Sequence, residues 1–144
     1  MKRHIPGLHS HQSNGDPPLE GLFLVRVEWA SYPWHSQKPF LQLRFVVLEP
    51  QSFSHRSFSG RLYSTERALW KFNWFLRDFG YDMELLAQDQ MDEKALLNLC
   101  GVVRTTYKTL NGHNFQNLEA FAPESDWGEL SLTDAQIVQA EKLR

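Results

Sequence analysis

The chain has 144 residues, a formal net charge of −2 and 42% hydrophobic residues, which fits one globular domain. A domain of this length buries about two-thirds of its unfolded surface and needs no disulfide or metal to fold. The single Cys100 excludes a disulfide framework within the chain, and no run of about 18 apolar residues could span a membrane. The basic N-terminus has no apolar stretch behind it, so we expect a cytoplasmic protein with no secretory signal.

Charge is uneven along the chain. Residues 1–82 hold ten Lys and Arg against seven Asp and Glu, whereas residues 83–144 hold five against ten. The sequence pI of about 6.3 lies below the value of about 9 that strongly basic nucleic-acid binders exceed. Contact with a polyanion would therefore depend on a local patch, and the alternative is that both halves carry ordinary solvated charge.

The first 19 residues follow neither the period of a strand nor that of a helix, and we predict a flexible tail there. From Glu20 onwards, apolar residues alternate with others through Trp29, which predicts a strand with Trp29 on its inward face. A second strand is predicted over Phe40–Glu49, where Pro50 ends it because proline cannot donate to a ladder.

A third strand is predicted over Arg56–Tyr63, with a bend or bulge at Gly60. A helix should then start at a Thr65 cap and end at Gly80, as hydroxyl and glycine residues at these positions indicate. Its apolar residues cover much of its circumference, so we expect Trp70 and Trp74 to be buried with the others. A second, short helix is predicted from Asp92 to Leu99.

The remaining chain predicts a hairpin and a final helix. Strands over Val102–Thr109 and Asn114–Phe121 flank Asn111-Gly112, the strongest short-range hairpin signal. Residues 124–132 look acidic and irregular, and Thr133–Leu143 is predicted to be a short helix. We therefore divide the chain into a tail (1–19), one domain (20–123) and an acidic C-terminal segment (124–144).

Three strands, a helical segment and a two-stranded hairpin follow the chain order of the OB-fold. We therefore expect a mainly β protein: a five-stranded Greek-key barrel with a helical segment between strands three and four and a short C-terminal helix. The alternative is an open α+β sheet with the helices on one face.

The same order of marks resembles the small OB-fold, single-stranded-DNA-binding-like proteins of phages and mobile elements. The marks are Gly21–Val25, Phe40–Phe45, Gly60–Tyr63, Leu76–Gly80, Leu99–Val103, Asn111–His113 and Asn117–Pro123, spread over about three-quarters of the chain. The resemblance implies binding of single-stranded DNA beside a replication or recombination system, and no catalysis. Such proteins often end in an acidic tail with an aromatic tip, whereas this chain ends in Glu141–Arg144.

An OB-fold binds oligonucleotides on the face of strands two and three, between the loops that join strands one to two and four to five. This chemistry needs cations for phosphates and flat rings for bases. The alternative is that outward Arg and Lys are plain surface, and that Trp34 and Tyr63 pack over the end of the barrel. The residues that we expect to contact nucleic acid are Trp34, His35, Lys38, Arg44, Arg56, Arg61, Tyr63, Arg104, Lys108 and His113.

The sequence gives little support for catalysis. It has no phosphate-binding glycine loop, no Gly-x-Ser-x-Gly and no His-Glu-x-x-His motif, and we expect no cofactor and no metal site. The first functional hypothesis is a module that binds single-stranded DNA, or RNA, with a replication or recombination protein as a further partner. The second is an assembly module that uses the same barrel to hold a partner protein, since interfaces also favour Trp, Tyr and Arg.

Overall fold

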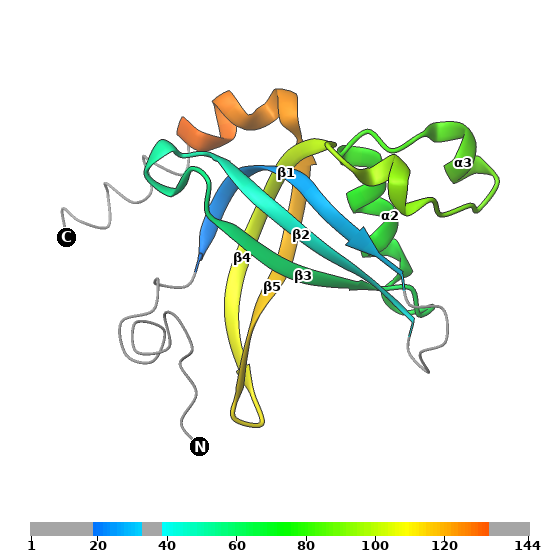
Figure 1. Cartoon of the computed structure of the whole chain (residues 1–144), viewed down its shortest axis with the longest axis horizontal. Helices are drawn as coiled ribbons and strands as arrows, with labels where there is room; N and C mark the ends of the chain where they lie inside the picture. The colour runs from blue at the N-terminus through cyan, green and yellow to red at the C-terminus, as the bar shows by residue number, and fades with distance from the viewer. Residues whose placement is uncertain (1–18, 33–38, 133–144) are drawn as a thin grey trace, which may run out of the picture.

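Five strands with one apolar face each form a single antiparallel sheet in a computed structural model that describes residues 19–32 and 39–132. The strands are β1 (Gly21–Ser31), β2 (Phe40–Glu49), β3 (Ser57–Tyr63), β4 (Cys100–Leu110) and β5 (His113–Pro123). Their order across the sheet is β3-β2-β1-β4-β5 (Figure 1). The prediction of a mainly β protein with five strands is confirmed.

The sheet curls so that its two outermost strands, β3 and β5, lie against each other. Gly60 of β3 allows this approach, because a methyl group at Gly60 would lie 2.6 Å from Cγ of Leu118 in β5. The predicted special role of Gly60 therefore takes the form of a close approach between strands rather than a register shift in β3.

Two short helices lie between β3 and β4 along the chain: α2 (Leu69–Asp78) and α3 (Met83–Ala87). The buried face of α2 covers the inner side of the curled sheet. Phe75 stands at the centre of this contact, with its ring 6.1 Å from that of Phe45 in β2 and 5.4 Å from that of Phe121 in β5. The core thus lies between the inner face of the sheet and α2.

The helical boundaries differ from those that the sequence predicts. Thr65 does not cap α2: the helix begins directly after a turn in which Thr65 O accepts from Ala68 N, and no side chain caps it. The helix α3 was not predicted, and its N-cap is Asp82. The helix predicted over Asp92–Leu99 is only a 3-10 turn, η2 (Glu93–Leu96).

Two tryptophans that the periodicity predicts to be buried are exposed. Trp29 is 48% exposed because β1 bulges between Val27 and Trp29, which reverses the alternation of faces after Val27. Trp70 is 64% exposed because the buried face of α2 covers less of the helix circumference than its composition indicates; the buried residues of α2 are Phe72, Phe75 and Leu76.

The β4–β5 hairpin closes through Asn111 and Gly112, whose φ angles of 52° and 78° suit the turn that the sequence predicts. Figure 1 shows this hairpin extending beyond the other strands. At the start of the fold, buried Leu19 is held by Thr105 Oγ1 and Gln116 Nε2, which both donate to its carbonyl oxygen.

The segment after β5 is ordered rather than irregular over residues 124–132. It contains a 3-10 turn, η3 (Glu124–Asp126), and helical residues 127–132. Trp127 Nε1 donates to Glu49 Oε2 at the end of β2, which fixes this segment to the sheet. The helix predicted over Thr133–Leu143 lies outside the described residues.

Candidate functional site

The register of β1, β2 and β3 aligns exposed side chains in rows across the outer face of the sheet. Directly paired residues of antiparallel strands point to the same face, so each row can be read from the pairing. One row is Trp29, Arg44 and Ser59; the next is Ser31, Gln42 and Arg61; the last is Phe40 and Tyr63. We call six of these residues the platform: Trp29, Phe40, Gln42, Arg44, Arg61 and Tyr63.

Arg61 is the best-fixed cation of the platform. Its Nε donates to Gln42 Oε1 at 3.0 Å, and its guanidinium carbon lies 4.4 Å from the centre of the Phe40 ring. This Nε–H bond uses one of the five donors of the guanidinium, and the terminal nitrogens carry the other four. A planar group held in this way can meet a phosphate or a carboxylate in bidentate fashion.

Further aromatic rings lie in the rows on either side of Arg61. The Phe40 and Tyr63 rings lie 5.7 Å apart, and Tyr63 is 38% exposed. Trp29 lies on the other side of the Arg61 row, in the row that it shares with exposed Arg44. The platform therefore alternates rings with guanidinium groups, with no acidic side chain among its six residues.

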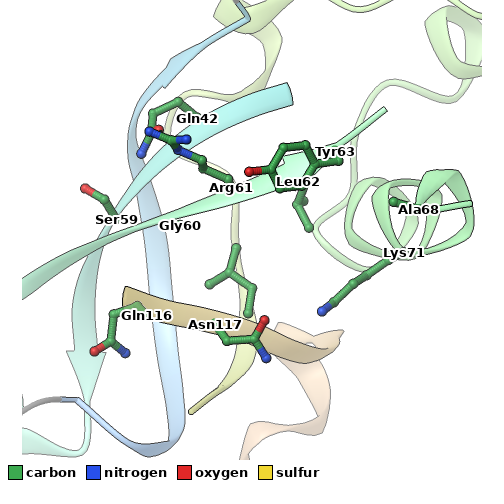
Figure 2. A pocket seen from close by; sticks show the side chains of 11 residues that line it. Gln42, Ser59, Gly60, Arg61, Leu62, Tyr63, Ala68, Lys71, Gln116 and Asn117 are labelled. Carbon is green, nitrogen blue, oxygen red and sulfur yellow. The ribbon is translucent and has the colours of Figure 1, made fainter. Parts of the chain in front are cut away.

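A groove of about 840 Å³ adjoins the platform where β3 and β5 diverge beside the start of α2 (Figure 2). Gln42, Arg61 and Tyr63 belong to both the platform and the groove. Figure 2 shows Lys71 reaching from α2 towards this space, with Gln116 and Asn117 of β5 on the opposite side. The groove therefore combines an apolar floor with polar and cationic sides.

Lys71 is the cation whose environment is most perturbed in this region. Partial burial lowers its pKa, the positive charge of Lys108 lowers it further, and Glu119 acts in the opposite direction. The ammonium groups of Lys71 and Lys108 therefore repel each other, and the carboxylate of Glu119 offsets part of this repulsion at Lys71. An anion in the groove would relieve this repulsion.

Three of the predicted site residues belong to the platform: Arg44, Arg61 and Tyr63. A fourth, Lys108, is exposed on β4 and acts electrostatically on Lys71. The structure thus brings the first three together on the platform, and Lys108 lies close enough to influence Lys71 of the groove.

Two predicted site residues lie elsewhere. Arg56 precedes β3 at the opposite end from Tyr63, and its guanidinium carbon lies 5.6 Å from the centre of the Phe53 ring. Arg104 pairs with Leu22 of β1. Leu22 lies seven residues before Trp29, so Arg104 is about 23 Å from the Trp29 row at the usual rise of a strand. Neither residue belongs to the platform.

Trp34, His35 and Lys38 lie outside the described residues, as does the side chain of His113. Tyr32 and Pro39, which flank the segment that contains the first three, both bond to Ser64, the residue after Tyr63 of the platform. Ser64 Oγ and Ser64 N both reach Pro39 O, at 3.1 Å and 3.0 Å, and the Ser64 hydroxyl also bonds to that of Tyr32. The β1–β2 connection therefore leaves and re-enters the fold next to Tyr63.

Sequence reasoning missed Trp29, Phe40 and Lys71 as members of this surface. Trp29 follows a bulge that no local pattern announces, and Lys71 lies on a helix whose sequence was assigned to the core. Phe40 begins a strand whose alternation does place it opposite the buried Leu41, and this signal could have identified it.

The described residues contain no group of three or more His, Cys, Asp or Glu that could hold a metal ion. Among the same residues, no helix has the length and apolar character to cross a membrane. No protein-family model matches the chain, and no curated protein matches it.

Proposed function

We propose that this protein binds single-stranded DNA through the platform, without catalysis, and that its curled sheet is a five-stranded OB-fold barrel. The observation that carries the proposal is the cluster of Arg61, Phe40 and Tyr63 on the open face of β2 and β3, in which a hydrogen-bonded guanidinium lies over the Phe40 ring and exposed Tyr63 lies beside that ring. The contact between Gly60 and Leu118, which brings β3 to β5, supports the barrel.

The platform offers both interactions that single-strand binding requires. Arg44 and Arg61 are exposed and can meet successive phosphates, while exposed Tyr63 and Trp29 present rings to unstacked bases. Half-buried Phe40 lies against the Arg61 guanidinium. A duplex keeps its bases stacked and paired, so it would use only the cations of this surface. Preference for single strands therefore follows from the rings rather than from the charge.

RNA presents the same rings and phosphates, and nothing in the platform selects against a 2′-hydroxyl. We take DNA as the first ligand and RNA as the comparison to be measured. The proposal includes a role in replication or recombination, in the cytoplasm of a cell that carries phage or mobile-element genes. It also includes a partner protein from the same system.

The direct test is the double variant Arg44→Ala with Arg61→Ala, measured against Arg104→Ala. The platform variant should weaken binding of a dT oligomer by about tenfold or more and reduce the salt slope by about 1.4, since each phosphate contact on a single strand contributes about 0.7. Its melting temperature should stay unchanged, because both side chains are exposed. Arg104→Ala removes one charge away from the platform and should bind as the unaltered protein does.

Equal binding by the platform variant and by Arg104→Ala would contradict the assignment of the site. Parallel loss of binding and of thermal stability would show that the two arginines serve the fold. Absence of binding by the unaltered protein at low salt would favour the second hypothesis, a module that holds a partner protein.

A further inference from the structure

Trp70 is the most exposed aromatic side chain in the described residues, and the platform does not include it. It is 64% exposed on the first turn of α2. Its ring stacks on that of Trp74, with centres 6.1 Å apart and an angle of 22° between the planes. Because Trp74 covers one face and the side chain remains so exposed, the other face of the Trp70 ring is open.

Trp74 holds this stack in place. Its Nε1 donates to Asp78 Oδ2 at 2.8 Å, and its ring meets that of Phe121 in β5 edge to face, with centres 5.6 Å apart. Burial raises the pKa of Asp78, while this hydrogen bond acts against the rise. The indole of Trp74 is therefore fixed by the helix on one side and by β5 on the other, and it supports Trp70 as a flat surface.

This surface continues from the groove. Ala68 and Lys71 line the groove, and Trp74 and Trp70 follow them around the circumference of α2 at about 100° per residue. A second hollow of about 540 Å³, lined by Tyr63, Thr65, Glu66, Arg67 and Ala68, shares Tyr63 and Ala68 with the groove. A chain leaving the platform at Tyr63 could thus follow the groove to Lys71 in the first turn of α2, and Trp70 lies further around that turn.

The charges along this route favour an anionic chain over an apolar one. The cations are Arg61 and Lys71 in the groove, Arg67 in the second hollow and Lys108, which acts on Lys71. The anions are Glu66 in the second hollow, Glu119, which acts on Lys71, Asp78, to which Trp74 donates, and Asp126, which acts on Asp78. The groove itself has two cations and no acidic side chain among its lining residues, which complements phosphates placed between the two stacking surfaces.

We propose that Trp70 is a second base-stacking site for the same single strand, which runs from the platform through the groove and over the first turn of α2. The inference rests on the proposed function and extends it, since it gives the path of the bound strand across the surface and a longer binding site. Phosphates between the two surfaces would lie near Arg61 and Lys71, and one base would rest on the open face of Trp70.

The experiment compares Trp70→Ala with Leu69→Ala, which removes a 50% exposed apolar side chain from the adjacent position of α2. Anisotropy is measured with dT oligomers of about 8 and about 20 nucleotides, which lie within and beyond the usual range of one OB-type barrel. Trp70→Ala should bind the longer oligomer about fivefold or more weakly and leave the shorter one nearly unchanged, because one stacked base is lost. Leu69→Ala should bind both oligomers normally, and Trp70→Phe should recover part of the loss.

Two results would overturn the inference while leaving the proposed function intact. One is unchanged binding of both oligomers by Trp70→Ala when Arg44→Ala with Arg61→Ala still weakens binding; Trp70 would then be free for a partner protein. The other is an equal loss at both lengths, which would make Trp70 part of the primary site. If the unaltered protein binds neither oligomer, the proposed function itself fails.

Discussion

The missing side chain at Gly60 decides how closely β3 can approach β5. The Cγ and both Cδ atoms of Leu118 occupy the space that a methyl group at this position would need, at 2.6–2.8 Å. Leu118 is itself buried in the core, so it cannot move aside without disturbing its neighbours. The groove begins at this contact, which links a single glycine to the shape of the candidate site.

Gly60→Ala should therefore lower the free energy of unfolding by about 1–3 kcal/mol, the usual cost of overpacking a core. Leu118→Ala alone should cost about 2–5 kcal/mol, because it leaves a cavity. The double variant should be more stable than the sum of the two losses predicts, by about 0.5–3 kcal/mol, since the new methyl group enters the space that Leu118 vacates. Chemical denaturation of the four proteins measures this coupling, and additive losses would contradict the close approach.

Single residues also show what local patterns cannot provide. The alternation of β3 correctly places Arg61 and Tyr63 on the outer face, because nothing interrupts the strand. The same reasoning fails at Trp29, since the bulge after Val27 depends on pairing with β2. It fails again at Trp70, because the width of the buried face of α2 is set by the sheet beneath it rather than by the helix.

At the scale of elements, the connection from α2 to β4 depends on one buried phenol. Tyr81 is buried, and its hydroxyl donates to Gln90 O at 2.8 Å and accepts from Asp92 N at 3.0 Å. These bonds join Tyr81, three residues after the end of α2, to Gln90 and Asp92 before η2, and α3 lies in the chain between them. Burial raises the pKa of Tyr81, with the negative charges of Asp92, Asp82 and Glu93 acting in the same direction.

Tyr81→Phe should lower the free energy of unfolding by about 1–3 kcal/mol, because two backbone groups lose their partner. Because the pKa of Tyr81 is raised in the folded state, its contribution to the free energy of unfolding is complete below the unfolded pKa of about 10. This contribution declines as the pH rises through the pKa of the folded state. The unaltered protein should thus lose stability above about pH 10 more steeply than Tyr81→Phe does. Denaturation between pH 7 and pH 11 measures the difference, and identical pH profiles would contradict this role.

Strands and their turn could be predicted well from the sequence, whereas the boundaries of α2 and the presence of α3 could not. Alternation gives β2 its observed bounds, and Asn111-Gly112 adopts the positive φ angles of the expected hairpin turn. Both signals are local. The start of α2 lacks a side-chain cap, and residues 127–132 are held by the bond from Trp127 to Glu49, which is distant in sequence. Such tertiary contacts override the local propensity of those segments.

At the scale of the whole molecule, the proposed function depends on how charge is distributed rather than on its sum. A net charge of −2 predicts no attraction to a polyanion, yet the platform has two arginines and no acid among its six residues. The sequence predicted half of the platform, because these residues follow simple alternation. The groove and the Trp70–Trp74 stack could not be predicted, since they arise where β3, β5 and α2 meet.

The central claim is that single-stranded nucleic acid binds through rings and phosphate contacts together. The most direct measurement is a titration of a dT oligomer of about 30 nucleotides, with a matched duplex, by intrinsic tryptophan fluorescence at several salt concentrations. We predict quenching by the single strand, weaker binding of the duplex, and an affinity for the single strand that falls with salt by a slope of at least about 1.4, as two phosphate contacts require. Absence of quenching and of binding at low salt, or equal affinity for single strand and duplex, would contradict the claim.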